Sequence, residues 1–171
     1  GTMSVGKTTL VNALKELPEF KNYTFRTERS KYLRDIGIPL NTDSTVKGQS
    51  IFLAERASEL MQEKIITDRT ILDVMAFARC SKSMNYLEAQ HFCNFASNMI
   101  HEYDYIFYVS PEGVDIEDNG VRETNSDYRK LIDQNILLLI EKNKFRIKNL
   151  VKISGSTEDR IKQIKDTLVS L

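Results

Sequence analysis

The chain opens on a stretch whose residue types and spacing are suited to binding phosphate. Gly1-Thr2-Met3-Ser4-Val5-Gly6-Lys7-Thr8 satisfies G-x-x-x-x-G-K-[ST] in full, and an apolar pattern of helical period follows it. In such a loop backbone N–H groups surround a β-phosphate, the lysine reaches the β- and γ-phosphates, and the hydroxyl takes a magnesium position. The N-terminus of the following helix adds a favourable dipole. A glycine-rich turn before a helix is the alternative. We therefore predict a site for ATP and Mg²⁺, with Lys7 catalytic and Thr8 a metal ligand, formed by Gly1, Met3, Ser4, Val5, Gly6, Lys7, Thr8 and Thr9.

Two carboxylates are candidates for the chemistry of phosphoryl transfer. Glu28 ends a predicted strand at 22–28, and Asp68 lies near the end of a predicted strand at 64–70. Transfer to a hydroxyl needs charge neutralisation and a carboxylate that receives the proton. Side chains at the carboxyl ends of parallel strands lie where open α/β sheets bind ligands, so both could face a γ-phosphate. For Glu28 the alternative is a helix-capping or salt-bridging role near Arg29.

Further polar residues are candidates for binding the acceptor or the transferred phosphate. Arginine suits this role because its planar fork pairs with two phosphate oxygens at once. Arg69 directly follows Asp68, and Arg129 lies on a predicted helix, where it could instead pair with Asp133 four residues on. The amide of Gln49 could donate to and accept from a base edge, or it could be solvated near the start of a helix.

The elements that must position these residues alternate between helix and strand along the whole chain. Apolar positions predict a helix after the loop that ends near Pro18, which cannot continue it. Asn85 and Glu88 have capping-box spacing, and Ser156 or Thr157 caps the terminal helix. Strands are expected at 22–28, 64–70, 103–110 and 149–156, and helices at 30–37, 49–62, 85–100 and 126–143, with an irregular loop over 38–48.

Within these helices, certain positions are expected to face the core. They are Leu10, Val11, Leu14 and Leu17 in the first helix, Leu87, Phe92, Phe95 and Met99 in the fourth, and Leu131, Ile132, Ile136 and Leu139 in the fifth.

The alternation predicts the α/β class, a three-layer sandwich with a parallel central sheet in one domain over 1–171. A phosphate loop normally follows a buried strand. We therefore expect about five mostly apolar residues before Gly1, which would form the central strand of the sheet.

Composition excludes several classes of protein. Lysine plus arginine (24) equals aspartate plus glutamate (24), so no overall field attracts nucleic acid or an anionic membrane. The two cysteines, Cys80 and Cys93, lack zinc-ribbon spacing, and His91 and His101 lack partners at metal-binding spacing. With no membrane span or signal pattern, the chain is expected to be cytoplasmic.

Residues outside the phosphate-binding loop indicate which class of protein the chain belongs to: a guanine-specific switch, a motor ATPase or a kinase. A guanine-specific switch would carry N-K-x-D, but Asn143-Lys144-Phe145-Arg146 has no aspartate in the fourth place. A motor ATPase generally needs a longer chain. A kinase therefore fits best.

The chain resembles small P-loop kinases, in particular the nicotinamide riboside kinase-like ATPase/kinase family of phages and bacteria. The resemblance rests on "GTMSVGKTTL", "RTERSKYLRDIGI", "GQSIFLAERASEL", "TDRTILDVMAFA" and "IEDNGVRETNSDYRKLID". The last segment looks like the family's "DDGVR" lid, from which it departs at Asn119. Deoxynucleoside kinases and thymidylate kinase have related layouts.

The resemblance implies roles for particular residues. A lid at about 111–129 would bring Arg122 over the γ-phosphate, with Arg129 as a second lid arginine, and would exclude water. Related nucleoside kinases use the acid after the second strand as base, which favours Glu28 for that role and Asp68 for Mg²⁺. "SGSTEDR" at 154–160 resembles a loop that lies against adenine.

Together these observations predict an ATP- and Mg²⁺-dependent phosphotransferase that acts on a nucleoside- or nucleotide-type acceptor. Lys7, Glu28, Asp68, Arg69 and Arg122 are the expected catalytic residues. Glu28, Gln49, Arg69 and Arg129 are the expected acceptor contacts. A kinase of hydroxymethylated pyrimidines in DNA and a regulatory ATPase without an acceptor are the alternatives. The sequence leaves the oligomeric state open, a homodimer included.

Overall fold

The computed structural model describes residues 1–3, 5–27, 29–111 and 126–169. In chain order the α-helices are α1 (Lys7–Lys15), α2 (Ser30–Asp35), α3 (Val46–Glu59), α4 (Ile71–Arg79), α5 (Tyr86–Ser97), α6 (Ser126–Lys142) and α7 (Thr157–Val169). The strands are β1 (Thr24–Arg26), β2 (Ile65–Thr67), β3 (Ile106–Val109) and β4 (Leu150–Ile153). Short 3₁₀ turns lie at Pro18–Phe20, Asn41–Asp43, Ile100–Glu102 and Lys144–Arg146.

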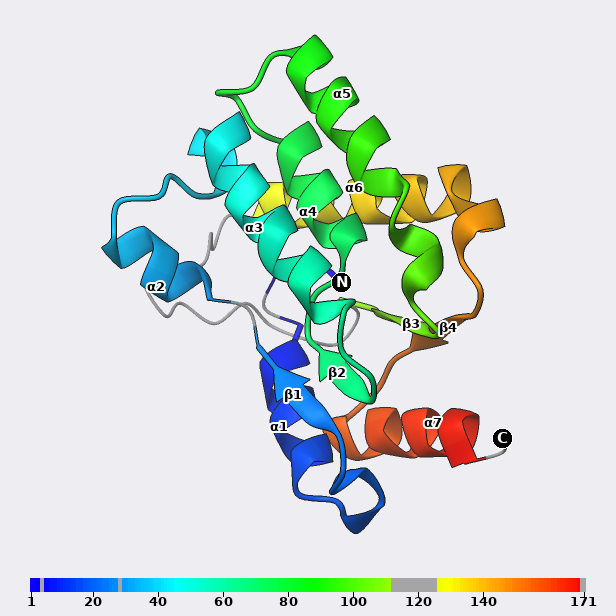
Figure 1. The fold of residues 1–171 in the computed structure, drawn as a ribbon. Helices are drawn as coiled ribbons and strands as arrows, with labels where there is room; N and C mark the ends of the chain where they lie inside the picture. Colours follow the sequence, from blue (N-terminus) through cyan, green and yellow to red (C-terminus); the bar gives the residue numbers. More distant parts are fainter. Residues whose placement is uncertain (4, 28, 112–125, 170–171) are drawn as a thin grey trace.

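The strands form two parallel pairs with helices on both sides. β1 pairs with β2 and β3 pairs with β4, with Arg26 opposite Thr67 and Val109 opposite Ile153. In Figure 1, α3, α4, α5 and α6 lie above the strands, α7 lies below β3 and β4, and α1 overlaps β1 in the lower part of the view. The layers and the parallel pairing agree with the predicted three-layer α/β arrangement.

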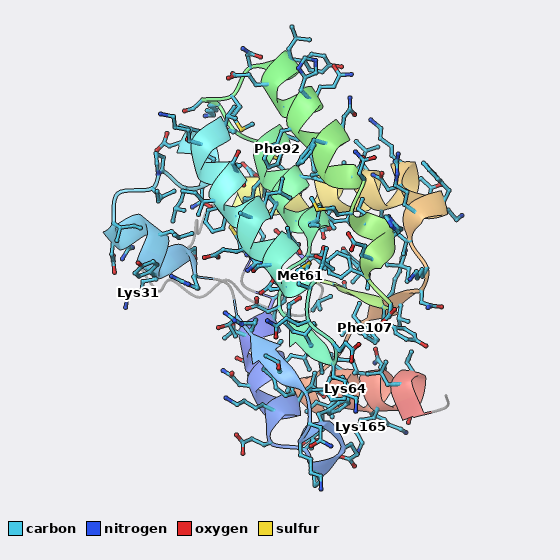
Figure 2. All side chains as sticks on the ribbon, viewed as in Figure 1. Lys31, Met61, Lys64, Phe92, Phe107 and Lys165 are labelled. Atoms are coloured by element: carbon cyan, nitrogen blue, oxygen red, sulfur yellow. The ribbon has the colours of Figure 1, made fainter. Side chains whose placement is uncertain are left out.

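Each helical layer has its own apolar core. The larger core lies among α3, α4, α5 and α6, where Figure 2 places Phe92, and it includes Met3 of the loop. The smaller core packs α1 and α7 against β3 and β4 and includes Val5, Leu10 and Ile164. Met3 and Val5, two residues apart in the loop, therefore belong to different cores.

A groove of about 560 Å³ separates the two strand pairs. Residues 65–68 of the β2 segment and 103–109 of the β3 segment line it, together with Gly1 and apolar side chains from both layers such as Leu14 and Ile136. β2 and β3 each pair on one edge, with β1 and β4 respectively, and their other edges border the groove.

Several expectations about single residues are wrong. Leu87 and Phe95 on α5 are 59% and 66% exposed, and Leu131 on α6 is 43% exposed. The buried face of each helix is therefore narrower than its apolar face. The expected irregular loop over 38–48 ends earlier, since α3 begins at Val46 and the Thr45 hydroxyl accepts the Gly48 N–H at 3.1 Å. Gln49 therefore lies one turn deeper in the helix than the sequence indicated.

Candidate functional site

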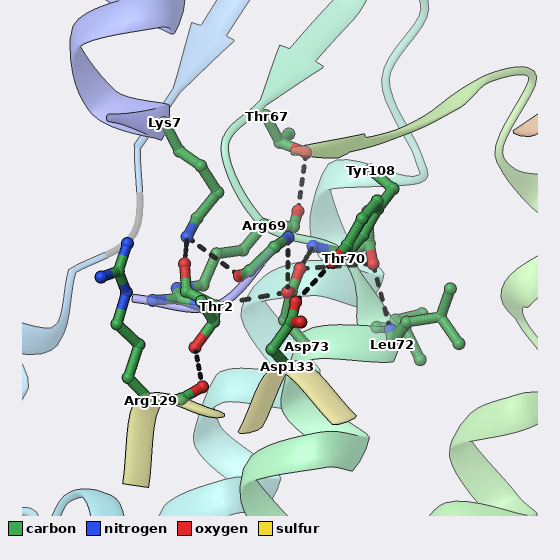
Figure 3. A network of polar contacts seen from close by, with 12 residues as sticks. Thr2, Lys7, Thr67, Arg69, Thr70, Leu72, Asp73, Tyr108, Arg129 and Asp133 are labelled. Carbon is green, nitrogen blue, oxygen red and sulfur yellow. Dashed lines mark hydrogen bonds and ion pairs between the residues drawn. The ribbon is translucent and has the colours of Figure 1, made fainter. Parts of the chain in front are cut away.

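The phosphate-binding loop runs from Gly1 into α1. Gly6 has a left-handed φ of 83°, which glycine adopts without strain. Gly1 packs so closely on β3 that a Cβ there would lie 2.5 Å from the Val109 carbonyl oxygen. Lys7 is buried, and its ammonium donates to the carbonyl oxygen of Gly1 at 2.9 Å and to that of Thr2 (Figure 3). The predicted loop residues thus meet in one place, apart from Ser4, which lies outside the described residues.

Thr8 and Asp68 form a pair of oxygen ligands at the base of the loop. The Thr8 hydroxyl donates to Asp68 Oδ2 at 3.1 Å, and Asp68 is only 8% exposed. Mg²⁺ prefers oxygen ligands and is usually held by one or two protein groups together with substrate phosphates. The described residues contain no group of three or more His, Cys, Asp or Glu that could hold a metal. Thr8 and Asp68 therefore fit a magnesium ion that is bound mainly through phosphates.

Arg69 and Asp73 lie next to the loop at the start of α4. Asp73 accepts the Thr70 N–H at 2.7 Å as part of a capping box, and it accepts from the Gly1 amino group at 3.3 Å. Burial lowers the pKa of that amino group to about 5. Arg69 Nη1 lies 3.9 Å from Asp73 Oδ1, and its guanidinium carbon lies 5.0 Å from the centre of the Phe77 ring.

Asp73 keeps its negative charge beside the loop. Burial alone would raise the pKa of Asp73, but the positive charges of the N-terminus, Arg69 and Lys7 outweigh burial and hold the pKa below its ordinary value. The Asp73 carboxylate is therefore a charged hydrogen-bond acceptor that lies between the phosphate-binding loop and α4.

A second cavity, of about 50 Å³, lies beside the loop among α3, α4 and the segment before α3. Six polar residues line it: Ser30, Asn41, Ser44, Gln49, Arg56 and Arg69. Phe52, Phe77 and Met3 contribute apolar walls. We call it the acceptor cavity, because it lies on the α3–α4 side of the phosphate-binding loop and is lined by groups that can hold a polar molecule.

The polar groups of this cavity are buried and incompletely bonded. Ser44 Oγ, Arg56 Nη1 and Arg69 Nη1 have no hydrogen-bond partner among the described residues. Gln49, which also lines the cavity, is 3% exposed. Leaving a buried donor or acceptor unbonded costs about 1–3 kcal/mol, so several such groups around one cavity indicate a polar ligand.

Arg56 is held in place by a buried ion pair. Its Nε and Nη2 donate to the two carboxylate oxygens of Glu59 at 2.5 and 3.2 Å. Burial by itself would lower the pKa of the Arg56 guanidinium, but the bond to Glu59 and the charges of Glu59 and Glu55 outweigh it and raise that pKa. Burial raises the pKa of Glu59. The pairing uses Nε and Nη2 of the guanidinium group, so Nη1 is the nitrogen that has no partner among the described residues. Arg56 lines the cavity.

Arg160 approaches the loop from the opposite layer. It lies in the first helical turns of α7 and is 3% exposed. Nη1 donates to the Val5 carbonyl oxygen, and Nη2 donates to the Ser110 carbonyl oxygen at 3.4 Å. Burial lowers the pKa of its guanidinium.

The remaining predicted residues fall into two groups. Glu28, Arg122, Asn119 and most of the predicted lid at 111–129 lie outside the described residues. Arg129 lies in the first turn of α6, where its carbonyl oxygen accepts the Thr2 hydroxyl at 2.8 Å and its Nη2 donates to the Pro111 carbonyl oxygen at 3.4 Å. Asp133, its suggested partner, accepts a hydrogen bond from the Tyr108 hydroxyl at 2.5 Å (Figure 3).

Sequence reasoning missed Arg56, Asp73, Ser44 and Arg160. Two of them carried a usable signal. Arg56 follows Gln49 by seven residues and Phe52 by four, which places all three on one face of a helix. Thr70 and Asp73 have capping-box spacing. The bonds of Ser44 and Arg160 depend on tertiary contacts, so neither residue had a local signal.

Comparison with known proteins agrees with this geometry. A family model described as an AAA domain matches residues 1–160. The chain belongs to this AAA domain family. Among curated proteins, none matches the chain. A solved structure described as deoxyadenosine kinase from M. mycoides with bound dCTP is similar at a TM-score of 0.68 and 18% identity, over 100% of this chain and 97% of that one.

The similarity extends over both chains almost completely, and it shows that this AAA domain protein has the α/β P-loop NTPase fold. Asn143, the first residue of the incomplete guanine-binding motif, packs inside the fold, where its amide donates to the Leu139 carbonyl oxygen at 2.9 Å. In the described part of the chain, no helix is long and apolar enough to cross a membrane.

Proposed function

We propose that this AAA domain protein is an ATP- and Mg²⁺-dependent phosphotransferase that moves the γ-phosphate to a hydroxyl of a nucleoside- or nucleotide-type acceptor. The loop with Lys7 and the Thr8–Asp68 pair supports the donor half of this proposal. The observation that carries the acceptor half is the cavity beside the loop, which is lined by Gln49 and by the unbonded Nη1 atoms of Arg56 and Arg69. A regulatory ATPase would not need that cavity.

The proposed reaction exchanges one P–O bond for another. The acceptor hydroxyl oxygen bonds to the γ-phosphorus as the bond from that phosphorus to the β–γ bridging oxygen breaks, and ADP leaves with the bond's electrons. The hydroxyl proton passes to a carboxylate, for which we propose Glu28. Lys7 is placed to stabilise the phosphate oxygens, and Thr8 and Asp68 would hold Mg²⁺, which neutralises phosphate charge when bound. We further propose Arg122, Arg69 and Arg129 as partners of the transferred phosphate or the acceptor.

The acceptor cavity has the composition of a site for a planar polar ring. Phe52 and Phe77 supply flat apolar walls, and the Gln49 amide and two guanidinium groups supply in-plane hydrogen bonds. At about 50 Å³ the cavity is smaller than a nucleobase. Binding would therefore require its wall at Leu40, Asn41 and Ser44 to move outward, although Thr42 accepts a hydrogen bond from the Lys82 N–H at 2.8 Å.

Transfer of label from γ-labelled ATP tests the proposal. The acceptors would be ribonucleosides including nicotinamide riboside, deoxynucleosides, their monophosphates, and DNA with ordinary or hydroxymethylated pyrimidines. We expect label in one of the small-molecule pools. Label in DNA alone would replace the acceptor with a base in DNA. ATP hydrolysis that no acceptor accelerates would contradict a kinase and favour a regulatory ATPase.

Replacing Gln49 with leucine should impair acceptor binding selectively. Leucine keeps most of the side-chain volume but removes the buried amide, so we expect KM for the acceptor to rise about tenfold or more while KM for ATP stays unchanged. Gln90→Leu, on the exposed face of α5, is the matched control. Equal acceptor KM values for Gln49→Leu and wild type would remove Gln49 from the acceptor site.

We also propose that the groove between β2 and β3 is a site into which a further parallel strand would fit. Gly1 lines one end of this groove, and the groove is bordered by the edges of two parallel strands. A strand that ran through it toward Gly1 would join the two pairs into one sheet and support the loop from below.

A further inference from the structure

Arg160 is a buried cation that no carboxylate in the described part of the chain neutralises. Its side chain is almost completely buried, and its Nε has no hydrogen-bond partner there. The nearest acid in sequence, Asp159, is engaged elsewhere, because its carboxylate accepts the Ser156 N–H at 3.0 Å. Burying an unpaired charge is costly, so proteins keep such a group where an anion or a set of dipoles compensates it.

The backbone dipoles that compensate the charge of Arg160 come from the phosphate-binding loop and from the residue that follows β3. Its guanidinium bonds the Val5 carbonyl oxygen in the loop and the Ser110 carbonyl oxygen just after β3. In a trans peptide the C=O and the following N–H point in opposite directions. Holding the Val5 carbonyl toward α7 therefore turns the Gly6 N–H away from α7.

Arg160 also ties a third segment to the loop. The turn at 154–156 precedes α7 directly, and Ser156 accepts the Arg160 backbone N–H at 3.0 Å and, through its hydroxyl, the Asp159 N–H at 3.1 Å. The backbone of Arg160 is thus bound to this turn, while its side chain is bound to the loop.

Resting on the proposed function, we propose that Arg160 is a positioning residue of the donor-nucleotide site. Arg160 fixes the Val5–Gly6 peptide so that the Gly6 N–H points toward a bound phosphate. It also adds a second positive charge next to the loop, on the α7 side, in addition to the charge of Lys7. The ligand it serves is the polyphosphate of a nucleoside di- or triphosphate, and the acceptor does not contact it.

Binding of ADP by R160M and R160K, measured by calorimetry with Mg²⁺, tests the inference without any acceptor. Methionine removes the charge and both hydrogen bonds, so we expect the Kd for ADP to rise at least about tenfold. Lysine keeps the charge but cannot bridge two carbonyl groups with a planar fork, so R160K should bind ADP with intermediate affinity. R79M is the matched control, because Arg79 is an exposed arginine at the end of α4 whose Nε donates to the Asn135 side chain on α6.

The kinetic readout separates positioning from a merely structural role. Both variants should raise KM for ATP and leave KM for the acceptor within about twofold of wild type. If R160M does not fold, the ADP affinity and the KM values of R160K test the inference. Wild-type affinity for ADP in a folded R160K or R160M would overturn the inference, even if the melting temperature fell. A wild-type protein that binds ADP but phosphorylates no acceptor would overturn the proposed function and leave the test of Arg160 intact.

Discussion

Replacing Asp68 with asparagine is expected to lower kcat by at least about a hundredfold, since a metal-ion contribution to charge stabilisation amounts to several kcal/mol. The carboxamide keeps the shape of the side chain and can still bond the Thr8 hydroxyl, which lies 3.1 Å from Asp68 Oδ2. It lacks the negative charge that would hold Mg²⁺. The variant should therefore bind ADP normally without metal but gain little affinity when Mg²⁺ is added.

A magnesium titration of transfer and of ADP binding measures both effects. Asp104→Asn is the matched control, because that side chain is 88% exposed and lies far from the loop in sequence. Glu28→Gln serves as the companion variant: as the proposed base it should lose transfer without changing the response to Mg²⁺. Full transfer by Asp68→Asn at low Mg²⁺ would remove Asp68 from the metal site.

Adding a strand-forming segment of about five apolar residues before Gly1 should stabilise the fold strongly and tighten ADP binding. A strand of about five mostly apolar residues would bury two or three large side chains, each worth about 1.5–3 kcal/mol. It would also turn the amino group of Gly1, now buried against Asp73, into an amide. We expect a rise of at least about 3 kcal/mol in the free energy of unfolding, measured in urea.

The control for this experiment is an extension of equal length made of glycine and serine. It converts the amino group into an amide but brings no apolar side chains or strand propensity. If the two extensions gave equal stability and equal ADP affinity, the groove would not bind the added strand.

The sequence predicted the α/β fold well, because the elements of that fold depend on local patterns. The glycine and lysine spacing of the loop is contiguous, and the apolar runs of β3 and β4 are short and distinct. The role of Asp68 was predicted from its place after a strand and stays a prediction; the structure places its Oδ2 atom 3.1 Å from the Thr8 hydroxyl.

The proposed acceptor half was harder to predict, because its residues come from segments far apart in the chain. Ser44 lies before α3, Arg56 lies two turns beyond Gln49, and Arg69 belongs to the segment before α4. Their relation depends on how α3 packs on α4, which no local pattern encodes. The same limit explains Leu87 and Phe95: periodicity shows that a face is apolar but does not show whether another element covers it.

The division of the loop between two cores has a consequence for how the molecule unfolds. Met3 packs into the core of α3–α6, Val5 packs into the core of α1 and α7, and Thr2 bonds the Arg129 carbonyl oxygen on α6. The loop is therefore a covalent and packed connection between two layers that the groove otherwise separates. A ligand that orders the loop should couple the melting of the two layers, so that calorimetric and van't Hoff enthalpies, unequal without nucleotide, become equal when ADP is bound.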